Sequence, residues 1–229
     1  MNAVGRRRPE PSLGWRCFEK AAVLGGLIVS LPALAAAAIA IKMEDGGPVF
    51  FRQSRIGRHG VPFQLLKLRS MTTGRPGATI TAAGDARVTP IGKFLRKYKL
   101  DEIPQLWNVL RGDMSLVGPR PELAVYIDRN DAQWQEILQF RPGITDLATL
   151  LHRDEETILG SAENPEQFYR QSILPAKLSL SAQYMRQSSS WQDLKLILWT
   201  IRFSLLPSAI NRQRLVDEFL PSPEPRRGT

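Results

Sequence analysis

The hydrophobic pattern of the chain is dominated by a long apolar segment near the N-terminus. No charged residue occurs from Ala21 to Ile41, and Lys20 and Lys42 flank this run. As one straight helix the run would measure about 30 Å, close to the thickness of a bilayer's hydrocarbon core. Its basic start and its alanines also resemble a secretory signal peptide, but the run is long for such a peptide.

Two membrane arrangements compete for this segment. A crossing helix should have few basic residues on one side, whereas lysines and arginines precede the run and follow it closely. Pro32 lies at the middle of the run and lacks a helical hydrogen-bond donor, so it favours a break. We therefore predict a re-entrant helix-break-helix over 20–42, broken near Pro32, where the Ser30 hydroxyl satisfies a freed carbonyl. Proline also occurs in helices that cross membranes, so the crossing arrangement stays open.

The pattern after this run predicts a β-hairpin. Strand-like residues 49–53 and 63–69 flank a loop around Gly57 to Gly60, which gives a loop of about four to six residues. Lys67 and Arg69 would share one face of the second strand. That face is either a solvated surface or a basic rim directed at a phosphate.

Helices dominate the rest of the pattern. Residues 72–90 predict a long loop, after which Thr89 and Pro90 are typical of a helix start. A second helix is predicted over 103–110, with Pro104 just inside it. Further helices are predicted within 122–140, where Trp134, Ile137 and Leu138 share a face, and from Asn164-Pro165.

The last predicted helix has apolar residues at helical spacing, namely Trp191, Leu194, Leu198, Ile201 and Leu205. This stripe indicates either a helix that faces the core or an amphipathic helix at a membrane interface. Taken together, the elements predict a small, mostly helical α+β protein with one hairpin. Its organisation is expected to be a basic N-terminal tail (1–13), one domain (14–206) and a flexible C-terminal tail (207–229).

The adjacent acids Asp101 and Glu102 lie among basic residues at the start of the second predicted helix. Carboxylates at a helix start are commonly simple caps. Two acids among fixed cations also suit chemistry on a phosphate, and helix starts bind phosphates. The segment Gly118-Pro119-Arg120-Pro121 is a stiff turn that presents one guanidinium. The segment Arg141 to Thr145 is a second such turn.

Composition narrows the choice of partner and of chemistry. The chain has 229 residues and a net charge of +9, which indicates an anionic partner. One cysteine excludes a disulfide framework within the chain, and two histidines without cysteine partners make a zinc site improbable. The chain has no recognisable nucleic-acid-binding module. This leaves an anionic membrane surface or phosphorylated substrates, and a non-catalytic membrane-peripheral adaptor stays an alternative to an enzyme.

From about residue 14 to 206 the chain resembles the bacterial sugar transferases, the monotopic phosphoglycosyl transferases. The resemblance rests on ordered motifs: Pro32 in the apolar run, Gly47-Pro48-Val49-Phe50-Phe51-Arg52-Gln53, Lys67-Leu68-Arg69-Ser70-Met71, Asp101-Glu102 with Pro104-Gln105, Asn108-Val109-Leu110-Arg111-Gly112-Asp113-Met114-Ser115, Val117-Gly118-Pro119-Arg120-Pro121 and Arg141-Pro142-Gly143-Ile144-Thr145. This family moves a sugar-1-phosphate from a UDP-sugar to polyprenyl (undecaprenyl) phosphate and releases UMP. The products begin exopolysaccharide, capsule, O-antigen or glycoprotein glycan synthesis.

The resemblance implies a covalent mechanism in which Asp101 attacks the β-phosphate and carries the phosphosugar until the lipid phosphate accepts it. Glu102 would assist with a proton or a metal. The family implies Mg²⁺, with Asp101 as its protein ligand. The residues expected to bind substrate and phosphate are Lys67, Arg69, Arg96, Pro119, Arg120, Arg141 and Thr145.

The resemblance also implies a location. The protein would lie on the cytoplasmic face of the bacterial inner membrane, among inner-leaflet lipids. The chain departs from the family pattern at Ser30-Leu31-Pro32, where serine and proline are commonly adjacent, and at Asp146 and Thr149, where glycine and glutamine are common. These departures put contacts beyond Thr145 in question and are consistent with a different sugar. The sequence identifies neither the sugar nor the oligomeric state.

Overall fold

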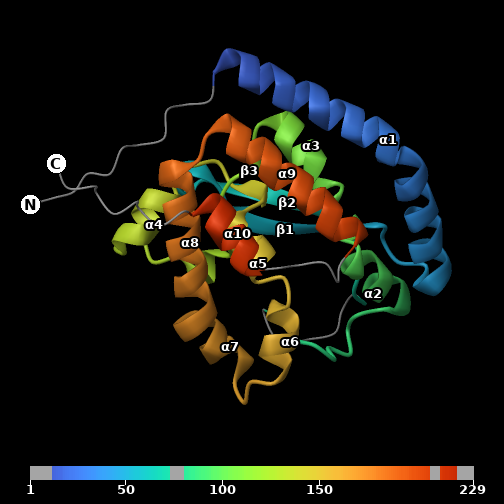
Figure 1. Ribbon diagram of the computed structural model, residues 1–229. Helices are drawn as coiled ribbons and strands as arrows, with labels where there is room; N and C mark the ends of the chain where they lie inside the picture. Colours follow the sequence, from blue (N-terminus) through green and yellow to red (C-terminus); the bar gives the residue numbers. More distant parts are fainter. Residues whose placement is uncertain (1–11, 73–79, 207–211, 221–229) are drawn as a thin grey trace, which may run out of the picture.

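The structure is a computed structural model that describes residues 12–72, 80–206 and 212–220 (Figure 1). Within these ranges it is mixed helix and strand and mostly helical, which confirms the predicted α+β class. The elements are α1 (Leu13–Asp45), β1 (Phe50–Ile56), η1 (Arg58–Gly60), β2 (Pro62–Leu68), α2 (Pro90–Lys97), η2 (Leu100–Glu102), α3 (Gln105–Arg111), β3 (Ser115–Val117), η3 (Ala124–Tyr126), α4 (Ala132–Ile137), β4 (Gly143–Thr145), α5 (Leu147–Leu151), α6 (Glu155–Gly160), α7 (Pro165–Phe168), η4 (Tyr169–Ile173), α8 (Leu174–Gln187), α9 (Ser190–Leu205) and α10 (Arg212–Phe219).

The apolar run forms one continuous helix, α1, that includes Pro32. The predicted separation into two helices is therefore not seen, and Figure 1 shows instead that α1 bends along its length. Pro32 has no N–H for the carbonyl one turn back. The Ser30 hydroxyl donates to the Leu27 carbonyl at 3.0 Å, one residue before the carbonyl that Pro32 leaves without a donor. The predicted contact of Ser30 with the freed carbonyl is therefore not seen, and the hydroxyl is bound to the preceding carbonyl instead.

Both ends of α1 pack on the same globular body. Val23 is buried in a cluster with Val109 of α3 and Met114, while Ile41 is buried with Leu68 of β2 and Leu95 of α2. Between these contacts the apolar stretch is largely exposed, and α1 is long and apolar enough to cross a membrane. Figure 1 shows the consequence, a helix that arches over one side of the molecule.

The predicted hairpin is confirmed. Strands β1 and β2 are antiparallel, with Phe50 opposite Leu68 and Ile56 opposite Pro62. The helix start at Thr89 is also confirmed, because its hydroxyl accepts a hydrogen bond from the Gly92 amide at 2.9 Å. In the predicted loop before it, residues 73–79 lie outside the described ranges, and residues 80–88 contain no helix or extended strand.

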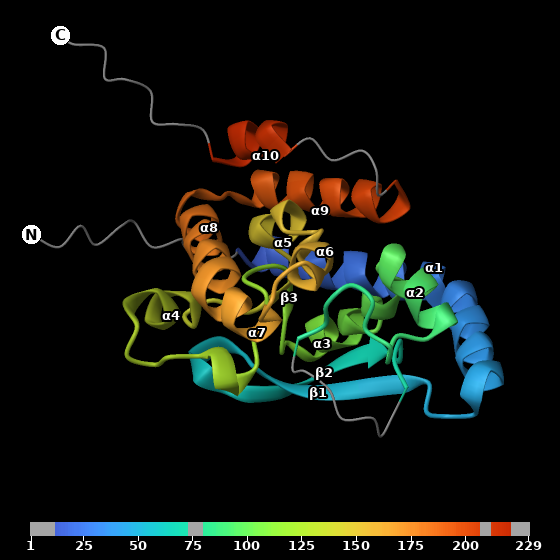
Figure 2. The same ribbon diagram turned by 90° about the horizontal axis from the view of Figure 1, so that it is seen from below.

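A second, two-stranded sheet was not predicted. Strands β3 and β4 have three residues each and run parallel, so that Ser115 is opposite Gly143 and Val117 is opposite Thr145. This pairing brings together the two proline-containing turns that follow β3 and precede β4. The main core lies between α5, α8, α9 and α10, with Leu147, Leu196 and Phe203 fully buried (Figure 2).

The apolar stripe of the last predicted helix does not face this core. In α9 the side chains of Trp191, Leu198, Ile201 and Leu205 are 65%, 58%, 52% and 68% exposed. The core-facing interpretation is therefore wrong for these four residues. The α9 side chains that enter the core are others, Leu196 and Phe203, so this helix has apolar residues on both its buried and its exposed sides.

Within the predicted C-terminal tail, residues 212–219 form helix α10. The prediction of a flexible tail is wrong for this part, because Leu215 and Phe219 are fully buried in the main core. The short amphipathic pattern of 212–219 is stabilised by this packing. Residues 1–11 of the predicted N-terminal tail and residues 207–211 and 221–229 of the C-terminal tail lie outside the described ranges.

Candidate active site

The two adjacent acids lie in a short 3-10 turn, η2, between α2 and α3. The chain reverses at Lys99, which has a left-handed backbone (φ 57°). This turn directs the carboxylates into the protein, and Asp101 and Glu102 are only 5% and 8% exposed. Carboxylates are rarely buried to this degree unless they are paired, so their partners define the site.

Glu102 is paired with two cations from distant parts of the chain. Its Oε1 accepts hydrogen bonds from Lys67 Nζ at 2.9 Å and from the Arg120 guanidinium at 2.8 Å. Burial alone would raise the pKa of Glu102, but the charges of Arg120 and Lys67 outweigh burial and hold this pKa well below its usual value. Glu102 is therefore ionised and fixed in position.

Asp101 has a different environment. Its Oδ1 is buried and has no hydrogen-bond partner among the described residues. Burial raises the pKa of Asp101 above its usual value, the charge of Lys67 opposes this, and the neighbouring charge of Glu102 adds to it. A buried polar atom without a partner is destabilising and needs a functional explanation. Asp101 thus offers one carboxylate oxygen that no described group of the protein occupies.

The helix-cap interpretation of the acids is not supported. Neither η2 nor α3 has a side-chain hydrogen bond at its start, and Pro104 occupies the cap position of α3. Glu102 is bound to side chains of β2 and of the turn after β3 instead. Glu102 therefore belongs to a buried cluster of ion pairs and does not cap a helix.

The turn that carries Arg120 is held by direct backbone contact with the second proline-containing turn. The Gly118 amide donates to Thr145 O at 3.1 Å and the Gly143 amide donates to Pro119 O at 2.9 Å. A Cβ atom at Gly143 would lie 2.1 Å from Gly118 N, so only glycine allows this approach. The contact fixes the backbone on both sides of Arg120 and thereby its direction toward Glu102.

Of the predicted binding residues, Lys67, Arg120 and Pro119 lie at the acids or frame them. Arg69 does not join them, because its guanidinium donates to Asp45 at 2.6 Å and to Pro48 O at 2.6 Å. It is buried and ties the end of α1 to the hairpin. This position gives Arg69 a structural role in the described chain.

Arg96, Arg141 and Thr145 also differ from the expected arrangement. Arg96 is ion-paired with Glu156 of α6 and lines a cavity that Lys99 also lines. The Arg141 side chain is exposed, and the Thr145 hydroxyl is buried in a 2.6 Å hydrogen bond with Thr200 of α9. In this arrangement Thr145 secures β4 against α9, and its backbone contacts Gly118.

A second buried charge cluster behind Arg120 was missed in the sequence. Glu122 accepts a hydrogen bond from the Tyr169 hydroxyl at 2.8 Å and is ion-paired with Arg55 at 3.5 Å and with Lys177 at 3.8 Å. The Arg55 guanidinium also donates to Pro121 O at 3.2 Å. In the sequence, the position of Glu122 directly after the turn that carries Arg120 is the feature that could have indicated its role. These contacts tie the second end of that turn to β1 and α8.

The site can be tested against the Mg²⁺ that the resemblance implies. Within the described ranges, no group of three or more His, Cys, Asp or Glu side chains could hold a metal. Mg²⁺ commonly keeps several waters and binds one or two carboxylates together with substrate phosphates. The unpaired Oδ1 of Asp101 fits one such ligand position, whereas Glu102 is already held by two cations. The residues therefore fit an ion held mainly by the substrate.

Comparison with known families identifies the family to which the chain belongs. The profile described as "Bacterial sugar transferase" matches residues 12–206. The chain therefore belongs to the bacterial sugar transferase family, and the matched range contains the acids, the hairpin and both proline-containing turns. Helix α10 lies outside it.

Several curated relatives are similar to the chain. It is 42% identical over 186 residues to the UDP-glucose:undecaprenyl-phosphate glucose-1-phosphate transferase of Caulobacter vibrioides, which covers 78% of this chain and 66% of that protein. It is 34% identical over 210 residues to the UDP-N-acetylgalactosamine-undecaprenyl-phosphate N-acetylgalactosaminephosphotransferase of Aeromonas hydrophila, covering 88% of this chain and 46% of that one. A glucose-1-phosphate transferase of Escherichia coli is 36% identical, covering 78% and 38%. The chain thus spans only part of these relatives' lengths, and it is similar to transferases for two different sugars.

Proposed function

We propose that this transferase moves a sugar-1-phosphate from a UDP-sugar to polyprenyl (undecaprenyl) phosphate through a covalent phosphosugar on Asp101. The observation that carries the proposal is the buried, unpaired Oδ1 of Asp101 beside the ion-paired Glu102. The family and the relatives' names support the reaction class. The relatives' names give two sugars, glucose and N-acetylgalactosamine, and the proposed role is the first membrane step of exopolysaccharide, capsule or other glycan synthesis.

The first step forms a bond between a carboxylate oxygen of Asp101 and the β-phosphorus of the donor. The bond from this phosphorus to the bridging oxygen breaks, and UMP leaves with that oxygen. A phosphate oxygen of the lipid acceptor then attacks the same phosphorus, and the Asp101 carboxylate leaves. Splitting one difficult transfer into two steps in this way is an established strategy.

The cations at the site stabilise the charge that moves in these steps. Arg120 and Lys67 are held at Glu102 and lie within the same charge cluster as Asp101. Fixed cations directed at a transferring phosphoryl group lower the barrier because they need no reorganisation. Glu102 keeps both of them in place. Mg²⁺, with Asp101 and the diphosphate as ligands, would supply further neutralisation when bound.

The anchoring of the protein is also a proposal. We infer that α1 enters one leaflet and returns, bent rather than interrupted, and that the exposed stripe of α9 lies in the interface. Two observations support this: both ends of α1 pack on the same body, and four large apolar side chains of α9 are more than half exposed. The site would then face the cytoplasm, at the level of the inner-leaflet phosphates. Tags at both termini should report the cytoplasm, and a periplasmic N-terminus would refute the arrangement.

The reaction is tested by UMP release over a panel of UDP-sugars, with polyprenyl phosphate present and Mg²⁺ either added or chelated. Wild type should release UMP from at least one donor, and Asp101→Asn should lower this rate by orders of magnitude. A non-catalytic adaptor would show no UMP release with any donor and no effect of Asp101→Asn. Loss of release on chelation would support the ion, and full activity without it would exclude a requirement for Mg²⁺.

A further inference from the structure

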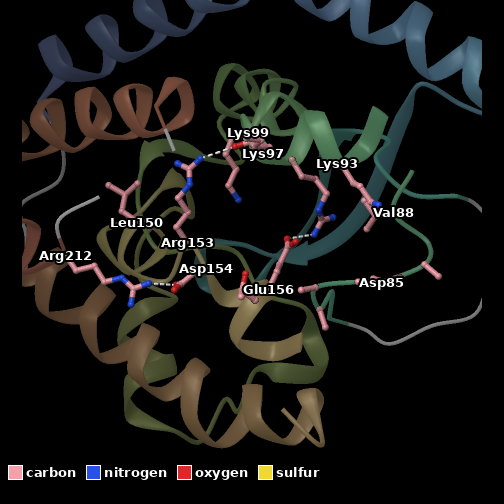
Figure 3. A pocket seen from close by; sticks show the side chains of 16 residues that line it. Asp85, Val88, Lys93, Lys97, Lys99, Leu150, Arg153, Asp154, Glu156 and Arg212 are labelled. Atoms are coloured by element: carbon pink, nitrogen blue, oxygen red, sulfur yellow. Dashed lines mark hydrogen bonds and ion pairs between the residues drawn. The ribbon is translucent and has the colours of Figure 1, made fainter. Parts of the chain in front are cut away.

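A cavity of about 870 Å³ has Lys99, which precedes the turn of the two acids, on its wall (Figure 3). Its wall comes mainly from α2, α6 and residues 82–88, and Lys99, the residue before η2, also lines it. Ligand sites for small molecules commonly measure about 300–1,000 Å³, so the cavity has room for a nucleotide. Lys99 is two residues before Asp101, and the charges of Lys99 and Arg96, which both line the cavity, act on the Asp101 carboxyl.

The wall of the cavity carries more basic than acidic side chains. Its basic residues are Lys93, Arg96, Lys97, Lys99, Arg153 and Arg212, and its acidic residues are Asp85, Asp154 and Glu156. The acids have partners of their own, since Glu156 is paired with Arg96, Asp154 with Arg212 and Asp85 with Arg87. Figure 3 shows the first two of these pairs beside the cavity.

Four basic side chains of the wall remain without an acidic partner among the described residues, namely Lys93, Lys97, Lys99 and Arg153. They come from three parts of the fold: α2, the turn before η2 and the segment between α5 and α6. Cations that repel one another around one space are stabilised when an anion enters it. The cavity therefore has the electrostatics of a phosphate-binding site.

We propose that this cavity binds the nucleoside diphosphate part of the donor, with Lys93, Lys97, Lys99 and Arg153 around its phosphates. The assignment rests on the proposed function, since it takes the donor to be a UDP-sugar. Apolar wall residues, among them Val88 and Leu150, provide surface for the base. The lipid acceptor also carries a phosphate, but its chain needs an apolar surface. Most of the large exposed apolar side chains of the described residues lie on α1 and α9, and none of them lines this wall.

One part of the wall lies outside the range of the family match. Arg212 belongs to α10, which begins after the end of the family match at residue 206. Its pairing with Asp154 places α10 at the cavity (Figure 3). Buried Leu215 and Phe219 hold the helix there. A segment beyond the family match thus helps to shape the proposed donor site.

Calorimetric titration of the full chain with uridine, UMP and UDP tests the assignment. Wild type should bind UDP more tightly than UMP, and UMP more tightly than uridine. The double variant K93A/K97A should weaken UDP binding about tenfold or more, because charged hydrogen bonds are lost, and should leave uridine binding nearly unchanged. Both lysines are exposed, so the variant should fold, which its unfolding temperature checks. The matched control R170A/R186A removes the same charge at exposed sites outside the cavity wall and should bind like wild type.

The outcomes separate the two proposals. UDP binding by wild type that K93A/K97A leaves unchanged would overturn the cavity assignment and spare the proposed function. No binding of UDP or of any UDP-sugar by wild type would overturn both. If K93A/K97A instead lost affinity for a short, water-soluble polyprenyl phosphate while retaining UDP, the cavity would belong to the acceptor and the assignment would again be overturned.

Discussion

Asp101 and Glu102 are neighbours in the chain and both are buried, but only Glu102 is neutralised by direct contacts. Its Oε1 is bound by Lys67 and Arg120, at 2.9 and 2.8 Å, while Oδ1 of Asp101 has no partner among the described residues. The surroundings therefore push the two pKa values in opposite directions. One acid becomes a fixed anchor for two cations, and the other is left available to react.

This asymmetry predicts opposite effects of two conservative substitutions on stability. The raised pKa of Asp101 favours its neutral form in the folded protein. Its stabilising contribution is present below the ordinary pKa and is lost as the pH rises through the raised value. Asp101→Asn should therefore raise the free energy of unfolding at neutral pH.

Glu102→Gln should have the reverse effect. The lowered pKa of Glu102 means that its contribution is present at neutral pH and is lost only as the pH falls through that lowered value. Removing the charge leaves Lys67 and Arg120 without their carboxylate, which costs about 3–5 kcal/mol for a buried pair. Denaturant unfolding of both variants beside wild type measures the difference. An Asp101→Asn protein less stable than the Glu102→Gln protein would contradict the assignment.

The raised pKa of Asp101 also predicts the pH dependence of the reaction. The attacking group must be a carboxylate, so kcat/KM should fall toward acid with an apparent pKa above about 3.9, the ordinary aspartate value. Glu102, whose pKa is lowered, should add no inflection in the same range. UMP release from pH 4 to 9 measures this, with circular dichroism at each pH as a control for folding. A rate that stays flat down to pH 4 would exclude Asp101 as an ionised nucleophile of raised pKa.

The contact between the two proline-containing turns predicts a sensitive glycine. Gly143→Ala would place a Cβ atom 2.1 Å from Gly118 N, and such overpacking costs about 1–3 kcal/mol. Because Gly118 begins the turn that carries Arg120, UMP release should fall along with the unfolding temperature. Gly25→Ala is the matched control, since nothing lies within 4 Å of its added Cβ atom and alanine favours the helix there. Equal activity of the two variants would refute the positioning role of this contact.

The exposed stripe of α9 predicts a membrane contact. Leu198→Glu and Ile201→Glu together should lower sedimentation of the chain with vesicles rich in anionic lipid, because two charges enter the apolar interface. Both side chains are more than half exposed, so the unfolding temperature should change little. Gln183→Glu and Gln187→Glu on exposed positions of α8 provide the charge-matched control. Unchanged vesicle binding of the α9 variant would assign this stripe to some other contact.

The sequence predicts those features of the fold that depend on neighbouring residues. The hairpin follows from strand-like runs on either side of a glycine-containing loop, and the cap at Thr89 follows from a hydroxyl before proline. The stiffness of the two turns follows from their prolines. Parallel pairing of β3 with β4 could not be predicted, because three-residue strands carry no usable periodicity. The same holds for α10, whose eight residues gain their stability from distant core residues.

The sequence predicts the two acids of the site and two of its cations, Lys67 and Arg120. The partner of a long basic side chain depends on the tertiary structure. Lys67 and Arg69 are two residues apart, but Lys67 binds Glu102 and Arg69 binds Asp45. Lys177, at the second buried cluster, is far from the acids in sequence and has no local signal. The departures at Asp146 and Thr149 coincide with buried polar atoms that lack partners. The other carboxylate oxygen of Asp146 accepts a hydrogen bond from the Ser181 hydroxyl.

The central claim is the covalent phosphosugar on Asp101, and mass spectrometry of the protein incubated with its UDP-sugar alone tests it most directly. Without the lipid acceptor the second step cannot occur, so the adduct should accumulate. We predict the mass of one sugar phosphate on the peptide that contains Asp101, and no such mass in Asp101→Asn. Fragmentation that places the added mass on Glu102, or release of UMP with the protein unmodified throughout, would contradict the account.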